Sequence, residues 1–194
     1  MNKKKILFLL FVLVALAQLY VPASMIIIRE EVLDTGTEYK FKIRPVDPND
    51  PFRGKYITLY FEENTYEIDS SETWETGEKI YVSLIKDNEG FMKIHSVSRS
   101  AQSNNVDFIE AKVDYVSTYD IPHELVIEYP FNRYYMEESK APVAETVYFE
   151  ASQDTSQVAY ALVYIKKGEA VLNGVFIDDQ PIEEIVESAV NLEK

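Results

Sequence analysis

The feature that most constrains this chain is a long apolar segment close to its N-terminus. The stretch from Ile6 to Ile28 has 23 residues, and its apolar character is interrupted at Gln18, Pro22 and Ser24. At about 1.5 Å of rise per helical residue, roughly 20 residues cross the hydrocarbon core of a bilayer. We therefore predict a transmembrane anchor at 6–28, which leaves 1–5 as an N-terminal tail and 29–194 as one further domain.

The residues around this segment predict its orientation. Three lysines at 3–5 precede it, and by the positive-inside rule they keep the N-terminus in the cytoplasm and the rest of the chain on the extracytoplasmic side. A cleaved signal peptide is the alternative, because Ala15-Leu16-Ala17 has the small-x-small form of a cleavage site. Tyr20 and Pro22 are typical of the interfacial end of a span, which favours an uncleaved anchor. The domain is exported in either case.

The charge of the exported part excludes a nucleic-acid-binding function. The chain has 19 basic and 33 acidic residues, so without the three N-terminal lysines 16 basic residues face 33 acidic ones, a formal charge of −17. A nucleic-acid-binding surface needs the opposite sign. The acidic residues occur as pairs at the ends of predicted elements, such as Glu62-Glu63 and Asp178-Asp179. Solvated loops explain them, and a surface for a cation or a basic partner is the alternative.

Period-two alternation of apolar and polar residues predicts a mainly β domain. The pattern recurs at 38–43, 80–84, 109–115 and 125–129, where the core-facing set includes Tyr39, Phe41 and Ile43 and then Ile109, Ala111, Val113 and Tyr115. Turn sequences such as "DTGT" at 34–37 and "DNEG" at 87–90 separate the strands. We expect antiparallel hairpins at 26–43, 79–98 and 158–177, arranged as a sandwich or a barrel-like sheet.

Two segments have the spacing of short amphipathic helices instead. Behind Pro142, the apolar residues Ala144, Val147, Tyr148 and Ala151 recur at i, i+3, i+4 and i+7. The same spacing follows Pro181, with Ile182, Ile185, Val186 and Ala189, and two glutamates lie in the first turn, where they favour a helix N-terminus. A short strand is the alternative at both places.

The segment "PVDPNDPFRG" at 45–54 is both stiff and charged. Pro45, Pro48 and Pro51 lie three residues apart, and each proline drives the residue before it toward an extended or polyproline II conformation. Polyproline II has three residues per turn, so Asp47, Asp50 and Arg53 would share one edge with Arg44. Bracing of the loop is one interpretation of that edge, and a recognition edge for a ligand or partner is the other. The aspartates lack the spacing of a calcium loop, so we expect no metal.

The strand that follows this segment divides its side chains between two faces. Gly54 permits the bend into "KYITLYF", where Ile57, Leu59 and Phe61 fall on one face and are expected in the core. Tyr56 and Tyr60 fall on the other face. They pack under another element or form an open stacking surface for a ligand.

A second concentration of aromatic and charged residues lies at 129–138, "YPFNRYYMEE". Asn132, Arg133 and Tyr134 combine an amide, a guanidinium fork and an aromatic ring, a set that binds peptides or glycans by stacking and bidentate hydrogen bonds. Core and edge packing is the alternative. We hypothesise that Arg133 and the 47–53 edge form one surface.

The stretch 45–61 resembles the signature of the GDYXXLXY family, a family of membrane-anchored bacterial proteins. Gly54, Tyr56 and Leu59 match the motif, Lys55 stands in place of its aspartate and Phe61 in place of its last tyrosine. The segments "FNRYYMEE" at 131–138 and "GEAVLNGVFIDDQPI" at 168–182 are also similar to the family. The resemblance implies a single-pass protein of the bacterial cell membrane, whose extracytoplasmic domain acts beside a multi-pass membrane protein.

Residues with catalytic chemistry are sparse in this sequence. It has two histidines and no cysteine; His95 shares a predicted strand face with Lys93, and His123 follows Pro122 in a predicted loop. Neither belongs to a hydrolase, metalloprotease or nucleotide-binding motif, and Ser24 has no lysine partner that the sequence identifies. We predict a binding or accessory domain without a cofactor. The alternatives are an enzyme acting on envelope material and a structural spacer.

Overall fold

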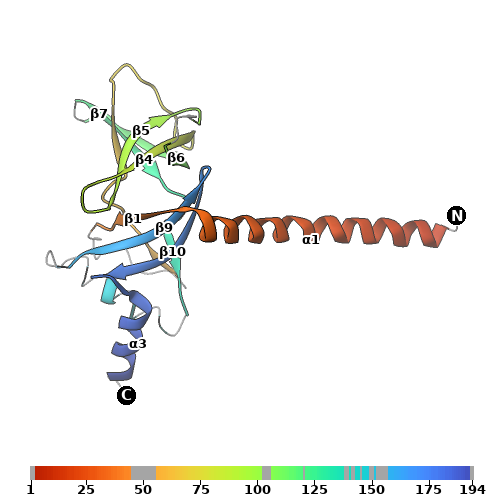
Figure 1. Ribbon diagram of the computed structural model, residues 1–194. Helices are drawn as coiled ribbons and strands as arrows, with labels where there is room; N and C mark the ends of the chain where they lie inside the picture. The colour runs from red at the N-terminus through yellow and green to blue at the C-terminus, as the bar shows by residue number, and fades with distance from the viewer. Residues whose placement is uncertain are drawn as a thin grey trace.

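A long helix projects from a β-rich body in the computed structural model (Figure 1). The structure describes residues 3–44, 56–101, 106–119, 121–137, 140, 143–144, 146–148, 151 and 157–192. We use "the body" for everything that follows the long helix. The stiff segment at 45–54, with Pro45, Pro48, Pro51 and Gly54, lies outside the described residues.

The long helix α1 spans Lys3–Thr35, and its most apolar window has a mean hydropathy of 2.5 with none of its residues buried. Its 33 residues extend about 50 Å, more than the roughly 30 Å of a bilayer core. The length and composition fit a single-pass membrane anchor. The predicted hairpin at 26–43 is wrong, because residues 26–35 continue this helix and only 37–42 form a strand. The sequence "DTGT" ends a helix here instead of turning a hairpin.

The described strands form antiparallel sheets. One has the order β1-β9-β10-β11, a second has the order β3-β7-β6-β4-β5, and β2 pairs with β8. The bounds are β1 Thr37–Lys42, β2 Tyr56–Thr58, β3 Thr65–Ile68, β4 Lys79–Lys86, β5 Met92–Ser98, β6 Phe108–Ser117, β7 His123–Glu128, β8 Arg133–Tyr135, β9 Ala159–Lys166, β10 Glu169–Ile177 and β11 Gln180–Pro181. Isolated bridges such as Ile43 to Phe61 and Ile109 to Gly168 join the sheets into a barrel-like body.

The mainly β prediction is confirmed, and so are the hairpins at 79–98 and 158–177, which are β4–β5 and β9–β10. Of the four residues predicted to face the core at 109–115, Tyr115 does not, since it is 53% exposed. A register shift between Val113 and Tyr115 against β7 is the signature of a β-bulge, which moves the following side chains to the opposite face. The alternation predicted for 109–115 therefore holds only as far as Val113.

Both predicted amphipathic helices are present. Residues 143–144, 146–148 and 151 are helical, and Ala144, Tyr148 and Ala151 are buried. The second helix, α3, spans Ile182–Leu192, and Ile182 and Val186 are fully buried. Each helix covers part of the core with the apolar face that the spacing predicts.

The junction between α1 and the body is short and tightly packed. Val32, on the last full turn of α1, is buried at 3% exposure, and the Gly36 amide donates to the Val32 carbonyl at 2.8 Å. On the side of β9, the Lys166 ammonium donates to Glu31 Oε1 at 2.6 Å and to Thr35 Oγ1 at 2.7 Å. The helix therefore passes into the first strand without a flexible linker.

Gly36 is the residue at which this junction leaves no room for a side chain. A Cβ at this position would lie 2.4 Å from the Val32 carbonyl oxygen and 3.0 Å from that of Ile165. We expect Gly36→Ala to lower the free energy of unfolding by about 3 kcal/mol, because backbone atoms cannot move aside. Gly77→Ala is the matched control: it meets nothing within 4 Å but has φ +81°, so it costs about 1 kcal/mol. Thermal or chemical unfolding of both variants measures this, and equal losses would contradict it.

Candidate functional site

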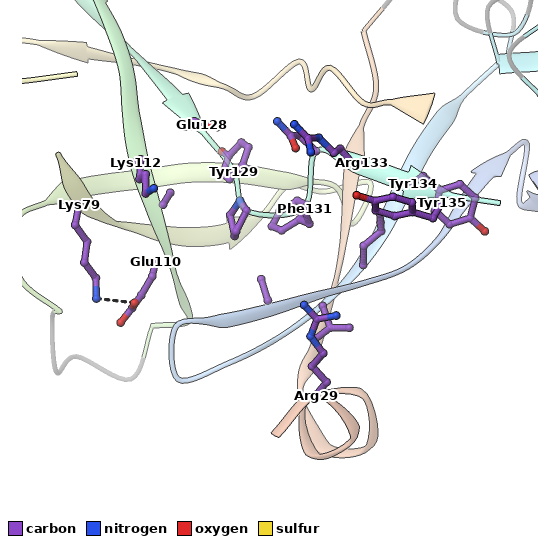
Figure 2. A pocket seen from close by; sticks show the side chains of 16 residues that line it. Arg29, Lys79, Glu110, Lys112, Glu128, Tyr129, Phe131, Arg133, Tyr134 and Tyr135 are labelled. Atoms are coloured by element: carbon purple, nitrogen blue, oxygen red, sulfur yellow. Dashed lines mark ion pairs between the residues drawn. The ribbon is translucent and has the colours of Figure 1, made fainter. Parts of the chain in front are cut away.

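A cleft of about 800 Å³ opens in the body next to the end of α1. Its lining comes from Arg29 of α1, Lys79 of β4, and the segments 110–112, 128–135 and 170–172. Figure 2 shows Arg29 reaching toward the cleft from α1, with Lys79 and Glu110 at one end and Arg133, Tyr134 and Tyr135 at the other. We call it the helix-side cleft. It joins residues that lie more than a hundred positions apart in the sequence.

Two buried aromatic rings form the floor of the helix-side cleft. Tyr129 and Phe131 are 3% and 6% exposed, and their rings stack with centroids 5.4 Å apart. Both contact Phe41 and Phe61, which also contact each other, so that the six ring pairs of this four-ring cluster have centroids 5.0–5.6 Å apart. The Tyr129 hydroxyl donates to the Glu63 carbonyl at 2.7 Å. The floor is therefore part of the core and fixed in position.

The walls of the cleft carry an excess of positive charge. Four cationic side chains, those of Arg29, Lys79, Lys112 and Arg133, and two carboxylates, those of Glu110 and Glu128, line it. Lys79 forms an ion pair with Glu110 at 2.6 Å. In a chain with a formal charge of −14, this is a locally cationic surface.

The pairing of β2 with β8 brings several of the sequence-predicted site residues together. Tyr56 lies opposite Tyr135, and Thr58 lies opposite Arg133. The Tyr56 and Tyr135 rings have centroids 5.4 Å apart, and the Arg133 guanidinium lies 5.0 Å from the centre of the Tyr56 ring. The Leu59 amide donates to the Asn132 carbonyl at 2.9 Å. The aromatic edge formed by Tyr56, Arg133 and Tyr135 thus borders the helix-side cleft.

The division of side chains predicted for 56–61 is confirmed. Ile57, Leu59 and Phe61 are 3%, 2% and 3% exposed, whereas Tyr56 and Tyr60 are half-buried. Tyr60 lies apart from the cleft lining and has the Arg44 guanidinium 5.7 Å from its ring centre. Both tyrosines are therefore packed against cations rather than open.

The charged edge predicted upstream falls on undescribed positions. Asp47, Asp50 and Arg53 lie outside the described residues, so the hypothesis that they share a surface with Arg133 stays a prediction.

The residues considered for catalysis do not gather at the cleft. Among the described residues, its lining includes neither His95 nor His123. The loop predicted for His123 is wrong, since this residue begins β7 and pairs with Ile68 of β3. The Ser24 hydroxyl donates to the Val21 carbonyl within α1 at 2.8 Å, an ordinary bond of a hydroxyl within a helix.

Sequence reasoning missed most of the cations that line the cleft. Arg29, Lys79 and Lys112 come from three different elements: the pairing of β4 with β6 brings the two lysines together, and the packing of α1 against β9 and β10 adds Arg29. Two signals were present in the sequence: Arg29 is the first charge after the apolar run, and Lys112 occupies an outward position between the core residues Ala111 and Val113.

Burial raises the pKa of two tyrosines, Tyr129 on the cleft floor and Tyr39 on β1. Burial, with the Glu63 carboxylate nearby as a smaller cause, raises the pKa of Tyr129 far above its usual value. Burial and the Asp107 carboxylate, to which the Tyr39 hydroxyl donates at 3.2 Å, raise the pKa of Tyr39 to about 12. The neutral phenol is thus the form that the folded state holds, as expected for groups removed from water.

These shifts predict alkaline destabilisation. Because the folded pKa exceeds the unfolded value of about 10, stabilisation is complete below pH 10 and is lost as the pH rises, for Tyr39 between about pH 10 and 12. We expect Tyr129→Phe to lower the free energy of unfolding by about 1 kcal/mol at pH 8 and to make the decline above pH 10 shallower. Tyr119→Phe, at a side chain 96% exposed, should reproduce the wild-type curve. Chemical unfolding at a series of pH values measures this. If the free energy of unfolding falls equally with pH in the wild type, Tyr129→Phe and Tyr119→Phe, Tyr129 is not a source of the alkaline destabilisation.

Comparison with known proteins bears directly on the segment that borders this cleft. No curated protein and no solved structure matches the chain. The sequence model of the GDYXXLXY protein family matches residues 18–175, which include the end of α1, the β2–β8 pair and the aromatic floor. The match covers most of the chain, and the protein therefore belongs to the GDYXXLXY family.

Proposed function

We propose that this protein is a membrane-anchored, extracytoplasmic binding domain that serves as an accessory subunit of an integral membrane assembly. The observation that carries the proposal is the rigid passage from α1 into the body. Val32 is buried there, and Lys166 of β9 binds both Glu31 and Thr35 of the helix. An anchored domain that cannot swing away from its helix presents one fixed face along the membrane.

The helix-side cleft lies on that face. Arg29 lines the cleft and directly follows Ile28, the last residue of the apolar run. The seven helical residues after Ile28, from Arg29 to Thr35, add about 10 Å of helix, so the body begins within the headgroup region or just beyond it. Such a position suits contact with the exposed part of a neighbouring membrane protein. A spacer would need the length of α1 but not the cleft.

The orientation of the domain is the first part of the proposal to test. The three lysines at 3–5 favour a cytoplasmic N-terminus. Because the chain has no cysteine, the single variants Asn2→Cys and Thr73→Cys each report one side of the membrane. We expect a membrane-impermeant maleimide to label Thr73→Cys in intact cells and Asn2→Cys only after permeabilisation. The opposite labelling pattern would reverse the proposed orientation.

The accessory role predicts a stable partner. We expect full-length protein with a C-terminal tag, purified in mild detergent, to retain a multi-pass membrane protein that mass spectrometry identifies. Tyr135→Ala, at the aromatic edge and 65% exposed, should reduce the amount retained. The matched control Tyr119→Ala, at an exposed side chain outside the cleft, should not. Recovery of the protein alone with an intact N-terminus would refute the accessory role and leave only the anchor.

A further inference from the structure

We infer that the helix-side cleft binds the phosphate headgroup of an anionic membrane lipid. The inference rests on the proposed function in one respect, because it requires the cleft to lie at the surface of the bilayer that α1 enters. The ligand class follows from the charge of the cleft, the orientation of Arg133 and the depth of the cleft relative to the membrane.

One wall of the cleft carries a like-charge pair on neighbouring strands. Lys79 of β4 and Lys112 of β6 lie directly opposite each other in the sheet, an arrangement that destabilises a sheet unless a counter-charge is present. Two carboxylates partly offset it: Glu110 forms an ion pair with Lys79, and Glu128 of β7 lies opposite Lys112 in the sheet. Within the described part of the chain, neither Lys112 nor Arg29 is in an ion pair. A bound anion would offset the positive charge that remains after Glu110 and Glu128 are counted.

Aromatic rings hold Arg133 in place at the other end of the cleft. Its guanidinium lies over the Tyr56 ring, and Tyr56 is packed against Tyr135 of the paired strand. A guanidinium stacked in this way keeps its N–H fork available and loses little conformational freedom on binding. The fork matches two oxygens of a phosphate. Arg133 is thus prepared to bind an oxyanion in a fixed orientation.

The depth of the cleft relative to the membrane also favours a lipid phosphate. Arg29 follows the last apolar residue of the predicted span and lines the cleft, so the cleft opens where lipid phosphates lie. Tyr134 and Tyr135 form its other side, and tyrosine is enriched at membrane interfaces because its ring is apolar and its hydroxyl is polar. A lipid could therefore place its phosphate in the cleft while its acyl chains stay in the bilayer beside α1.

The balance of charge limits the ligand further. Four cations and two carboxylates give the cleft a formal charge of +2, which suits a headgroup with a single phosphodiester charge. A polyanion such as a nucleic acid would also meet the strongly acidic remainder of the body. The phosphate of phosphatidylglycerol is a suitable probe of this chemistry.

The test uses the full-length protein in vesicles of phosphatidylcholine that contain spin-labelled lipids. Electron paramagnetic resonance measures the selectivity of the protein for labelled phosphatidylglycerol over labelled phosphatidylcholine. We expect selectivity for the anionic lipid and a loss of about tenfold in Arg133→Gln or Lys112→Gln, since each removes one charge-assisted contact. Glu128→Gln, which removes a carboxylate from the cleft, should raise selectivity by about threefold.

Two controls separate binding in the cleft from general attraction to exposed cations of the body and from loss of folding. Lys86→Gln removes an exposed cation of β4 outside the cleft and should leave selectivity unchanged. Thermal unfolding of each variant confirms that the body is folded. Equal loss in Lys86→Gln and Arg133→Gln, or no gain in Glu128→Gln, would overturn the inference.

Three further outcomes distinguish a lipid from a free anion and separate failure of the lipid site from failure of the proposed function. Displacement of the lipid by inorganic phosphate at equal concentration would show a site for a free anion instead of a lipid. Absence of lipid selectivity in a protein that still retains its membrane partner would refute the lipid site alone. A cytoplasmic location of the body in the cysteine-labelling experiment would instead refute the proposed function.

Discussion

Four aromatic rings in mutual contact, those of Phe41, Phe61, Tyr129 and Phe131, hold together segments that belong to different sheets. Phe41 lies on β1, Phe61 follows β2, and the other two lie between β7 and β8. Each edge-to-face or stacked pair contributes about 0.5–1.5 kcal/mol beyond the burial of its surface. Isolated bridges and ring contacts such as that of Phe91 with Tyr160 also join the described sheets, and this buried four-ring cluster strongly constrains how the sheets sit on one another.

The position of the helix-side cleft follows from the same cluster. Tyr129 and Phe131 form its floor, and the chain leaves Phe131 directly into β8, whose first residue is Arg133. β1 connects the cluster to α1 through the close contact at Gly36. The rings therefore fix Arg133 at one end of the cleft, while the packed junction fixes Arg29 at its other side. A cleft built in this way needs no movement of the body to form.

The sequence predicted the elements in which buried residues recur at a short, regular spacing. Alternation identified the buried set on β1, and the helical spacing identified α3, because in both cases neighbouring residues reveal the buried face. The hairpin at 26–43 failed because an apolar run of this kind suits a helix or a strand equally well, and tertiary contacts of Val32 and Lys166 decide between them. The cleft could not be predicted for a related reason: its cations come from distant elements, and strand order is not visible in a single sequence.

The GDYXXLXY motif has a physical meaning in this arrangement. Leu59 and Phe61 enter the core, where Phe61 joins the four-ring cluster and a phenyl ring suffices because its neighbours there are three other rings. Tyr56, on the opposite face of the strand, packs against Tyr135 and lies beneath the Arg133 guanidinium. One short strand thus connects the core to the edge of the cleft, with alternate residues serving each. A tyrosine is required at position 56 in a way that it is not at position 61, since its ring orients the cation that we expect to bind phosphate.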